Sequence, residues 1–142
     1  MTVMRNAFVD TNILVYAVDH AEKSLRKRQI AQEILLLPCL CLSVQVLNEF
    51  ISVARNSNKL NLSRDQEGRW LREWFEFKIT AITILTFHKA LELHLSYQLS
   101  HWDSLIIASA QETKCSIVYS EDMNHGQNYD GVQVINPFAE LS

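Results

Sequence analysis

The chain has 142 residues, of which 48% are hydrophobic and 20% are charged, and this balance predicts one folded globular domain over residues 1–142. It contains only 3 glycines and 2 prolines, which excludes collagen-like sequences, flexible linkers and the glycine-rich loops that bind nucleotide phosphates. The formal net charge of −3 excludes a strongly basic surface, so a nucleic-acid partner would have to be held locally.

The sequence also bears on location. No apolar run approaches the length of a membrane span, and residues 1–10 lack the charged, apolar and small-residue zones of a signal peptide. We therefore expect a cytoplasmic protein with no membrane partner. An odd number of cysteines suits neither a disulfide framework nor a zinc site, so we expect buried, reduced thiols. Cys39 and Cys41 would share one face of a strand, and Cys115 would stand alone.

The first half of the chain alternates short apolar runs with helical patterns. Pro38 is expected to end a helix, because proline disfavours helical backbone in the residue before it. Ser43 is a suitable N-cap, and Glu49 falls in the middle of the helix that follows it. The predicted elements, in chain order, are a strand over 7–9, a polar turn over 10–12, a helix from 13, a helix over 22–37, a strand over 39–43 and a helix from 44.

The second half continues the alternation. Ser63 and Gln66 have the spacing of a capping box, and Asp103 stands near the predicted start of a later helix. The predicted elements are a helix from 64, a strand over 80–85, a helix through 90–99, a helix from about 103, a strand over 116–120, a polar loop over 121–131 and a strand over 132–136. Strands that alternate with helices predict a three-layer α/β/α fold with a mainly parallel central sheet.

Four acidic residues occupy places where a carboxylate does not help packing. Asp10 follows the first strand, Glu49 lies in an otherwise apolar helix, Asp103 opens a helix, and Asp122 follows the strand over 116–120. Ligands of parallel sheets bind beyond the carboxyl ends of the strands, where Asp10 and Asp122 map. Taken singly, each residue has an ordinary explanation as a helix-edge, helix-start or turn residue.

Taken together, the four carboxylates indicate a site for metal-dependent chemistry. Hard oxygen ligands suit Mg²⁺ or Mn²⁺, and converging carboxylates can hold such ions for attack by water on a phosphodiester. The sequence offers no positioned histidine or lysine as a general base, since a histidine just before a helix, such as His101, is more often structural. The pattern therefore favours metal-dependent hydrolysis.

Four segments resemble the successive acidic motifs of PIN-domain nucleases, a family that includes the VapC-type toxins of bacterial toxin–antitoxin pairs. The segments are FVDTNILVYAVD, LNEF, HWDSLIIASA and YSEDM, and the tail GVQVINPF is also similar to the end of such domains. The resemblance implies a PIN-like fold and an Mg²⁺- or Mn²⁺-dependent endoribonuclease. It implies catalytic and metal-binding roles for Asp10, Glu49, Asp103 and Asp122.

The resemblance also implies supporting residues and partners. Asn12 would hydrogen-bond an acidic partner or a metal-bound water, Ser120 would position the fourth carboxylate, and Thr11 would shape the turn. Glu121 competes with Asp122 for the fourth position, and we favour Asp122. Homodimers and a small antitoxin protein are common in the resembled family, and RNA would be the substrate.

Two other functions stay open at this stage. A non-catalytic PIN-like scaffold that binds RNA or protein would share the fold, although the presence of all four acids argues against a decayed site. A phosphotransfer enzyme or receiver domain also places acids at strand ends. That class is disfavoured because Asn12 stands where the Asp-x-Asp motif of acid phosphatases needs its second aspartate.

Overall fold

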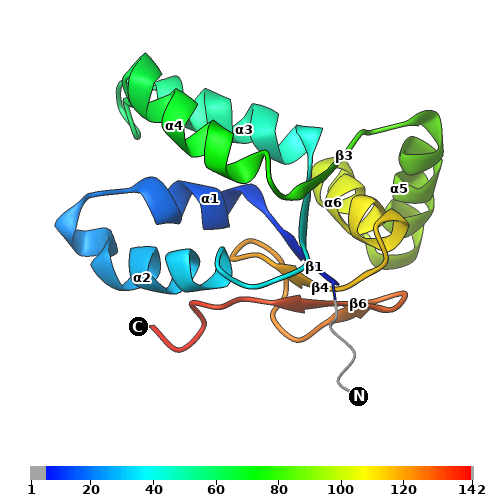
Figure 1. The fold of residues 1–142 in the computed structure, drawn as a ribbon. Helices are drawn as coiled ribbons and strands as arrows, with labels where there is room; N and C mark the ends of the chain where they lie inside the picture. The colour runs from blue at the N-terminus through cyan, green and yellow to red at the C-terminus, as the bar shows by residue number, and fades with distance from the viewer. Residues whose placement is uncertain (1–5, 142) are drawn as a thin grey trace.

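A computed structural model describes residues 6–141, and its centre is a mixed but mostly parallel sheet (Figure 1). Residues 1–5, which belong to the N-terminal segment considered above, and residue 142 lie outside the described residues. The sheet has the strand order β3-β2-β1-β4-β6-β5, and only the β5–β6 pair is antiparallel. The strands are Asn6–Val9 (β1), Leu40–Ser43 (β2), Lys78–Thr80 (β3), Cys115–Tyr119 (β4), Asn128–Tyr129 (β5) and Val132–Ile135 (β6).

Helices cover both faces of this sheet, with α1 and α2 on one side and α5 and α6 on the other (Figure 1). This arrangement confirms the three-layer α/β/α fold. The helices are Thr11–Val18 (α1), Leu25–Ile34 (α2), Val44–Arg55 (α3), Arg64–Trp74 (α4), Ile84–Tyr97 (α5) and His101–Glu112 (α6), with a 3-10 turn over Glu22–Ser24. Within residues 6–141, none of the helices has both the length and the apolar character needed to cross a membrane.

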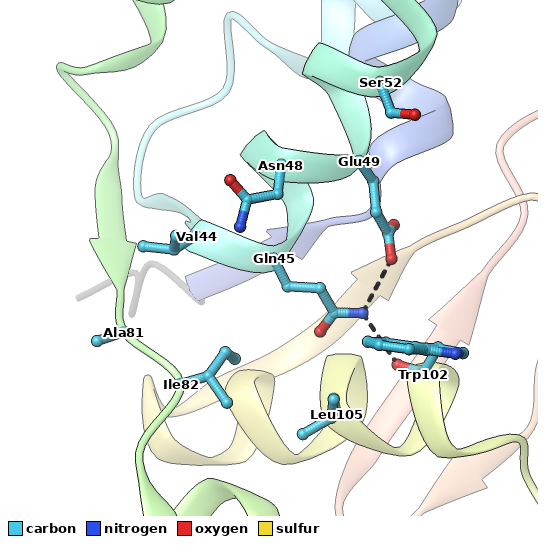
Figure 2. Close-up of a pocket in the computed structure, with 9 residues that line it drawn as sticks. All are labelled: Val44, Gln45, Asn48, Glu49, Ser52, Ala81, Ile82, Trp102 and Leu105. Carbon is cyan, nitrogen blue, oxygen red and sulfur yellow. Dashed lines mark hydrogen bonds between the residues drawn. The ribbon is translucent and has the colours of Figure 1, made fainter.

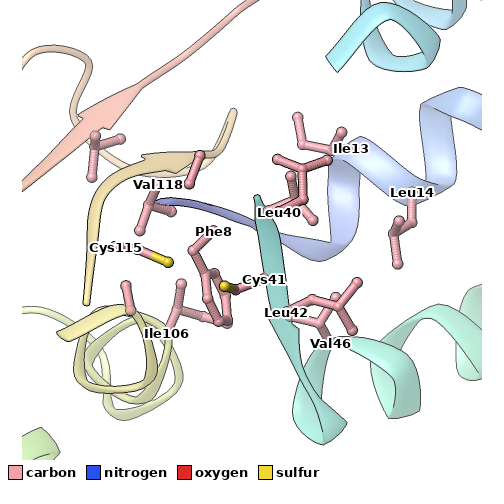
Figure 3. Packing of buried hydrophobic residues seen from close by; sticks show 14 of the residues in the cluster. Phe8, Ile13, Leu14, Leu40, Cys41, Leu42, Val46, Ile106, Cys115 and Val118 are labelled. Atoms are coloured by element: carbon pink, nitrogen blue, oxygen red, sulfur yellow. The ribbon is translucent and has the colours of Figure 1, made fainter. Parts of the chain in front are cut away.

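The alternation of side chains along the strands builds two layers of core (Figure 3). Phe8 and Cys41 point toward Ile106 of α6, whereas Leu42 points to the opposite face, toward Val46 of α3. All five of these side chains are buried. Because both faces of the sheet are covered by helices, its strands can be apolar on both sides, which is typical of parallel sheets.

The strand predicted over 80–85 is wrong. The third strand is Lys78–Thr80, and Ile84 already begins α5. Thr83 is the N-cap of that helix, and its side chain and that of Thr86 each bond to the other's backbone N–H in a capping box. The β-branched composition of the segment favoured a strand, but the capping box fixes a helix start inside it.

Several helix and strand boundaries also differ from the predicted ones. The helix predicted over 22–37 is a 3-10 turn followed by α2, which ends at Ile34, before the expected stop. The helix expected near Asp103 begins at His101, because Ser100 caps it by accepting the N–H of Asp103. The predicted polar loop contains the short strand β5, and α5 ends when Gln98 adopts a left-handed conformation with φ 59°.

The cysteine prediction is partly wrong. Cys41 and Cys115 are buried and free, as expected. Cys39 is exposed, because it precedes β2 and has a φ of 62°, which places it in a turn and not on the face that carries Cys41. The thiols are not paired in disulfides, and burial raises the pKa of Cys115 to about 12.

Candidate active site

Parallel pairing of β1 with β4 sets Asp10 and Ser120 side by side, since each residue follows the last residue of its strand. Asp10 is the N-cap of α1 and is only 5% exposed. One carboxylate oxygen accepts the N–H of Thr11 at 2.7 Å, and the other accepts the hydroxyl of Ser120 at 2.7 Å. Both oxygens are therefore oriented by the strand ends and by the first turn of the helix.

Burial changes the chemistry of Asp10. Removal from water raises the pKa of its carboxyl from 3.8 to about 6, and the negative charges of Asp122 and Glu49 add to the increase. The hydrogen bonds from Ser120 and Thr11 act in the opposite direction, because they stabilise the ionised form. The net direction shows that the folded chain holds this charge at a cost.

Glu49 approaches the same region from α3. One carboxylate oxygen accepts the hydroxyl of Thr11 at 2.7 Å, and the other accepts the amide N–H of Gln45 at 3.2 Å. The same amide group donates to the backbone carbonyl of Trp102 at 3.3 Å, as the dashed lines of Figure 2 show. Gln45 therefore connects the helix that carries Glu49 with the residue that precedes Asp103.

Asp103 and Asp122 complete the set. Asp103 is the third residue of α6 and is half-buried, and burial raises the pKa of its carboxyl, with smaller contributions from the charges of Asp122 and Glu49. Asp122 is exposed, and it accepts the side-chain N–H of Asn12 at 3.1 Å. The charges of Glu49 and Asp122 raise the pKa of both Asp10 and Asp103, so the four carboxylates lie near enough to one another to interact.

Asn12 and Ser120 make the kinds of contact expected of supporting residues. The carbonyl oxygen of Asn12 accepts the backbone N–H of Glu121 at 3.2 Å, while its amide group donates to Asp122. The hydroxyl oxygen of Ser120 accepts the backbone N–H of Asp122 at 3.2 Å. The turn after β4 is thereby tied to the turn after β1, and the direction of Asp122 is restricted.

Glu121 is engaged elsewhere. Its carboxylate forms an ion pair with Lys27 of α2 at 2.6 Å and accepts the hydroxyl of Tyr16 at 2.7 Å. The ammonium group of Lys27 also lies 4.7 Å from the centre of the Tyr16 ring, a cation–π distance. These contacts hold Glu121 against α1 and α2, so Asp122 is the residue of this pair that neighbours Asp10 and Asp103.

The four carboxylates lack a neutralising side chain. Among residues 6–141, the ion pairs are those of Lys27 with Glu121 and of Arg55 with Glu67. Over the same range, no three acidic, histidine or cysteine side chains lie close enough to hold a metal ion between them. Carboxylate oxygens are the donor type that Mg²⁺ and Mn²⁺ prefer, and Mg²⁺ keeps several of its waters and is usually bound through only one or two carboxylates.

Two residues near the carboxylates were missed by the sequence interpretation. Thr11 was expected only to shape a turn, yet its hydroxyl donates to Glu49. Gln45 was not singled out, although it precedes Glu49 by four residues and therefore lies on the same helix face. That spacing is the signal that could have found it, whereas the contact of Thr11 depends on how α3 packs against α1.

Comparisons with known proteins agree with this fold. A family model described as a PIN domain matches residues 7–129. A comparison with curated proteins finds no significant match. Among solved structures, the chain resembles one in a toxin–antitoxin complex from Klebsiella pneumoniae, with a TM-score of 0.66 and 22% identity over 93% of this chain and 98% of that one.

Two further structures are similar. One is VapC20 of Mycobacterium tuberculosis, described as a toxin that cleaves the sarcin-ricin loop, with a TM-score of 0.66 and 15% identity over 84% of this chain and 92% of that one. The other is VapBC2 of Rickettsia felis bound to a DNA fragment from its promoter, with a TM-score of 0.60 and 16% identity over 90% and 96%. At these identities the likeness establishes the fold.

Proposed function

The chain belongs to the PIN domain family, and from this membership we propose that it is an Mg²⁺- or Mn²⁺-dependent endoribonuclease that hydrolyses RNA phosphodiester bonds. We further propose that residues 1–142 form its one nuclease domain and that it acts in the cytoplasm as the toxin of a type II toxin–antitoxin pair. Asp10, Glu49, Asp103 and Asp122 are the proposed catalytic and metal-binding residues. Asn12 and Ser120 support them.

One observation carries the proposal more than any other. The carboxylate of Asp10 is 5% exposed, has two hydrogen-bond donors, and lies beside two further negative charges without a cation among residues 6–141. A buried charge in such surroundings is expensive to maintain, and packing alone gives no reason to keep it. A divalent cation at this position would remove the penalty.

The side chains would act by orientation and by charge. Thr11 fixes two carboxylates at once, since its N–H binds Asp10 and its hydroxyl binds Glu49. Asn12 orients Asp122 by donating a hydrogen bond to its carboxylate. A divalent cation bound there supplies a Lewis acid that lowers the pKa of water and offsets charge that develops on the phosphate. Without a cation, the same carboxylates would repel an RNA phosphate.

The proposed toxin function also implies protein partners. Two of the similar structures are complexes of a toxin with an antitoxin, which supports a small antitoxin protein as a partner of this chain. A homodimer is supported by α5, where Ile84, Leu91 and Leu95 are exposed apolar residues at positions spaced by seven and four. Such a stripe is typical of a helix face that packs against another protein.

The deciding experiment is cleavage of varied RNAs by the purified chain, with Mg²⁺ or Mn²⁺ and then with excess chelator. Wild type should cleave only with the metal. Asp10→Asn and Asp103→Asn keep the side-chain volume but remove one charge each, so each should lower the rate by orders of magnitude. Asp65→Asn, at an exposed position in the first turn of α4, is the matched control and should cleave like wild type.

Folding must be checked for each variant by circular dichroism. If folded Asp10→Asn and Asp103→Asn proteins cleave at the wild-type rate, the assignment of these residues is wrong. If wild type cleaves none of a broad set of structured and single-stranded RNAs, the non-catalytic scaffold replaces the nuclease as the preferred function.

A further inference from the structure

A pocket adjoins the proposed active site and shares one of its carboxylates. It has a volume of about 760 Å³ and lies between α3, the segment after β3, and the start of α6 (Figure 2). Its lining includes Val44, Gln45, Glu49, Ile82, Trp102 and Leu105. The volume is in the range of about 300–1,000 Å³ that is typical of small-molecule sites. Because Glu49 belongs to both, the pocket continues directly from the carboxylates.

The pocket offers a flat aromatic surface. Trp102 is 62% exposed, an unusual state for so large an apolar side chain, and it immediately precedes Asp103. The other two tryptophans differ, since Trp74 is buried and Trp70 stacks on it with ring centres 5.7 Å apart. An exposed indole beside a pocket is a stacking surface for a planar ring.

The pocket also contains a buried acceptor with a fixed orientation. Gln45 is 8% exposed, and its amide nitrogen donates to the Glu49 carboxylate and to the Trp102 carbonyl. Both partners are acceptors, so the amide cannot be reversed. The amide oxygen therefore points the other way, toward Ile82 (Figure 2), and it has no hydrogen-bond partner among the residues that the structure describes.

We propose that this pocket binds a nucleobase of the RNA substrate, next to the phosphate that is cleaved, with the base stacked on Trp102 and an N–H of the base donated to the oxygen of Gln45. The inference rests on the proposed ribonuclease function, because it places the phosphate at the carboxylates. It adds a specificity subsite to that function. An RNA chain that is bound there by its phosphate has its adjacent base within reach of the pocket.

A base suits this pocket better than an apolar protein side chain. A leucine or phenylalanine would fill the apolar part but would leave the oxygen of Gln45 without a donor, and an unpaired buried acceptor is costly. Every nucleobase combines a flat face for the indole with N–H groups at its edge. A base therefore satisfies the indole and the Gln45 oxygen at once.

The test for binding needs neither metal nor cleavage. The four nucleosides are titrated into ¹⁵N-labelled protein in chelator, and the three tryptophan indole N–H signals are followed by NMR, with Trp102→Phe used to assign the signal of residue 102. At least one nucleoside should shift the Trp102 signal saturably while the Trp70 and Trp74 signals stay in place, and ribose alone should have no effect. Gln45→Met, which removes the acceptor, should weaken this binding by about two- to tenfold.

A cleavage test gives a second readout. Trp102→Ala should raise KM for RNA by about ten- to a hundredfold and flatten the nucleotide preference beside the cleavage site. Trp102→Phe should restore most of both, because it keeps an aromatic face. Trp70→Phe, a change of indole outside the pocket, is the matched control and should cleave like wild type.

The outcomes separate the two proposals. If wild type cleaves RNA but no nucleoside shifts the Trp102 signal, or all three indole signals shift alike, the base subsite is wrong and the nuclease stands. If the Trp102 signal depends on protein concentration and not on nucleosides, a second copy of the chain covers the pocket and the base subsite is again wrong. If nucleosides bind but RNA is not cleaved, the pocket binds a base, whereas the proposed ribonuclease function, and with it the role of the pocket in cleavage, is wrong.

Discussion

Asp10→Asn should stabilise the metal-free protein at pH 8, although Asp10 is a proposed catalytic residue. The carboxyl is 5% exposed, and its pKa is raised from 3.8 to about 6, first by burial. One pKa unit corresponds to about 1.4 kcal/mol, so ionisation of Asp10 costs the folded protein about 3 kcal/mol at pH 8. Asparagine removes this charge but accepts only one of the two present hydrogen bonds, a loss of about 1 kcal/mol.

The sign of the pH dependence follows from the direction of this shift. Well below pH 3.8 the group is protonated in both the folded and the unfolded chain, so it costs nothing. As the pH rises toward 6, the unfolded chain ionises first, and the free energy of unfolding falls. Above pH 7 the full cost is present. Between pH 4.5 and pH 8 the contribution of Asp10 therefore changes by about 2 kcal/mol.

The assay is urea unfolding of wild type and Asp10→Asn in chelator at these two pH values. The difference in free energy of unfolding between variant and wild type should be about 2 kcal/mol more favourable to the variant at pH 8 than at pH 4.5. Comparing two pH values isolates the ionisation of Asp10, because asparagine does not titrate and its hydrogen bonds contribute equally at both. Asp65→Asn, at an exposed site, should show no such difference.

Equal differences at the two pH values would refute the reasoning, since they would mean that the Asp10 carboxyl is not destabilised by its surroundings. A larger advantage for the variant at pH 4.5 would refute it more strongly, because the sign would be reversed. Either result would also remove the observation on which the proposed cation site most depends.

Three further predictions test other parts of the proposal. Mg²⁺ or Mn²⁺ should raise the urea midpoint of wild type in a concentration-dependent way, and that of Asp10→Asn less, because the ion offsets charge repulsion in the folded state only. Midpoints that do not change with metal concentration in either protein would contradict a cation site. Thr11→Val should lower kcat for RNA cleavage, because Glu49 loses the hydroxyl that binds it at 2.7 Å, and Thr11→Ser should restore kcat. A fully active valine variant would exclude this role for Thr11. Leu95→Asp, at a position that is 80% exposed on α5, should convert a dimer into a monomer in light scattering, and a variant that stays dimeric would show that the interface lies elsewhere.

The sequence by itself determined the order of the elements apart from the short strand β5, and it proposed most of the candidate residues. Its information is local: Ser43 as a helix cap, the Ser63–Gln66 capping box, and the acids that follow strands are each visible within a few residues. Local signals also predicted one element wrongly. The segment after β3 has strand-like composition, but Thr83 and Thr86 form a helix cap within it. Where two local preferences compete, composition alone does not rank them.

The tertiary structure decided which of these residues meet. Glu121 and Asp122 are adjacent in the sequence and chemically similar, yet Lys27 and Tyr16 hold Glu121 against α1 and α2, while the charge of Asp122 acts on Asp10. The pairing of β1 with β4 brings together residues 110 positions apart, as the bond of Ser120 to Asp10 shows. Contacts of this kind depend on strand order and helix packing, and no spacing along the chain encodes them.

The same reason explains the residues that the sequence did not reveal. Gln45 is an ordinary helical residue until α6 packs close enough for its amide to reach the carbonyl of Trp102. Thr11 becomes a partner of Glu49 only because α3 lies against α1. The local sequence pattern decides which side chains lie on each face of a helix or strand. The packing of helices and strands decides the distances between those side chains, and the hydrogen bonds, the charge repulsion and the pocket beside Glu49 depend on these distances.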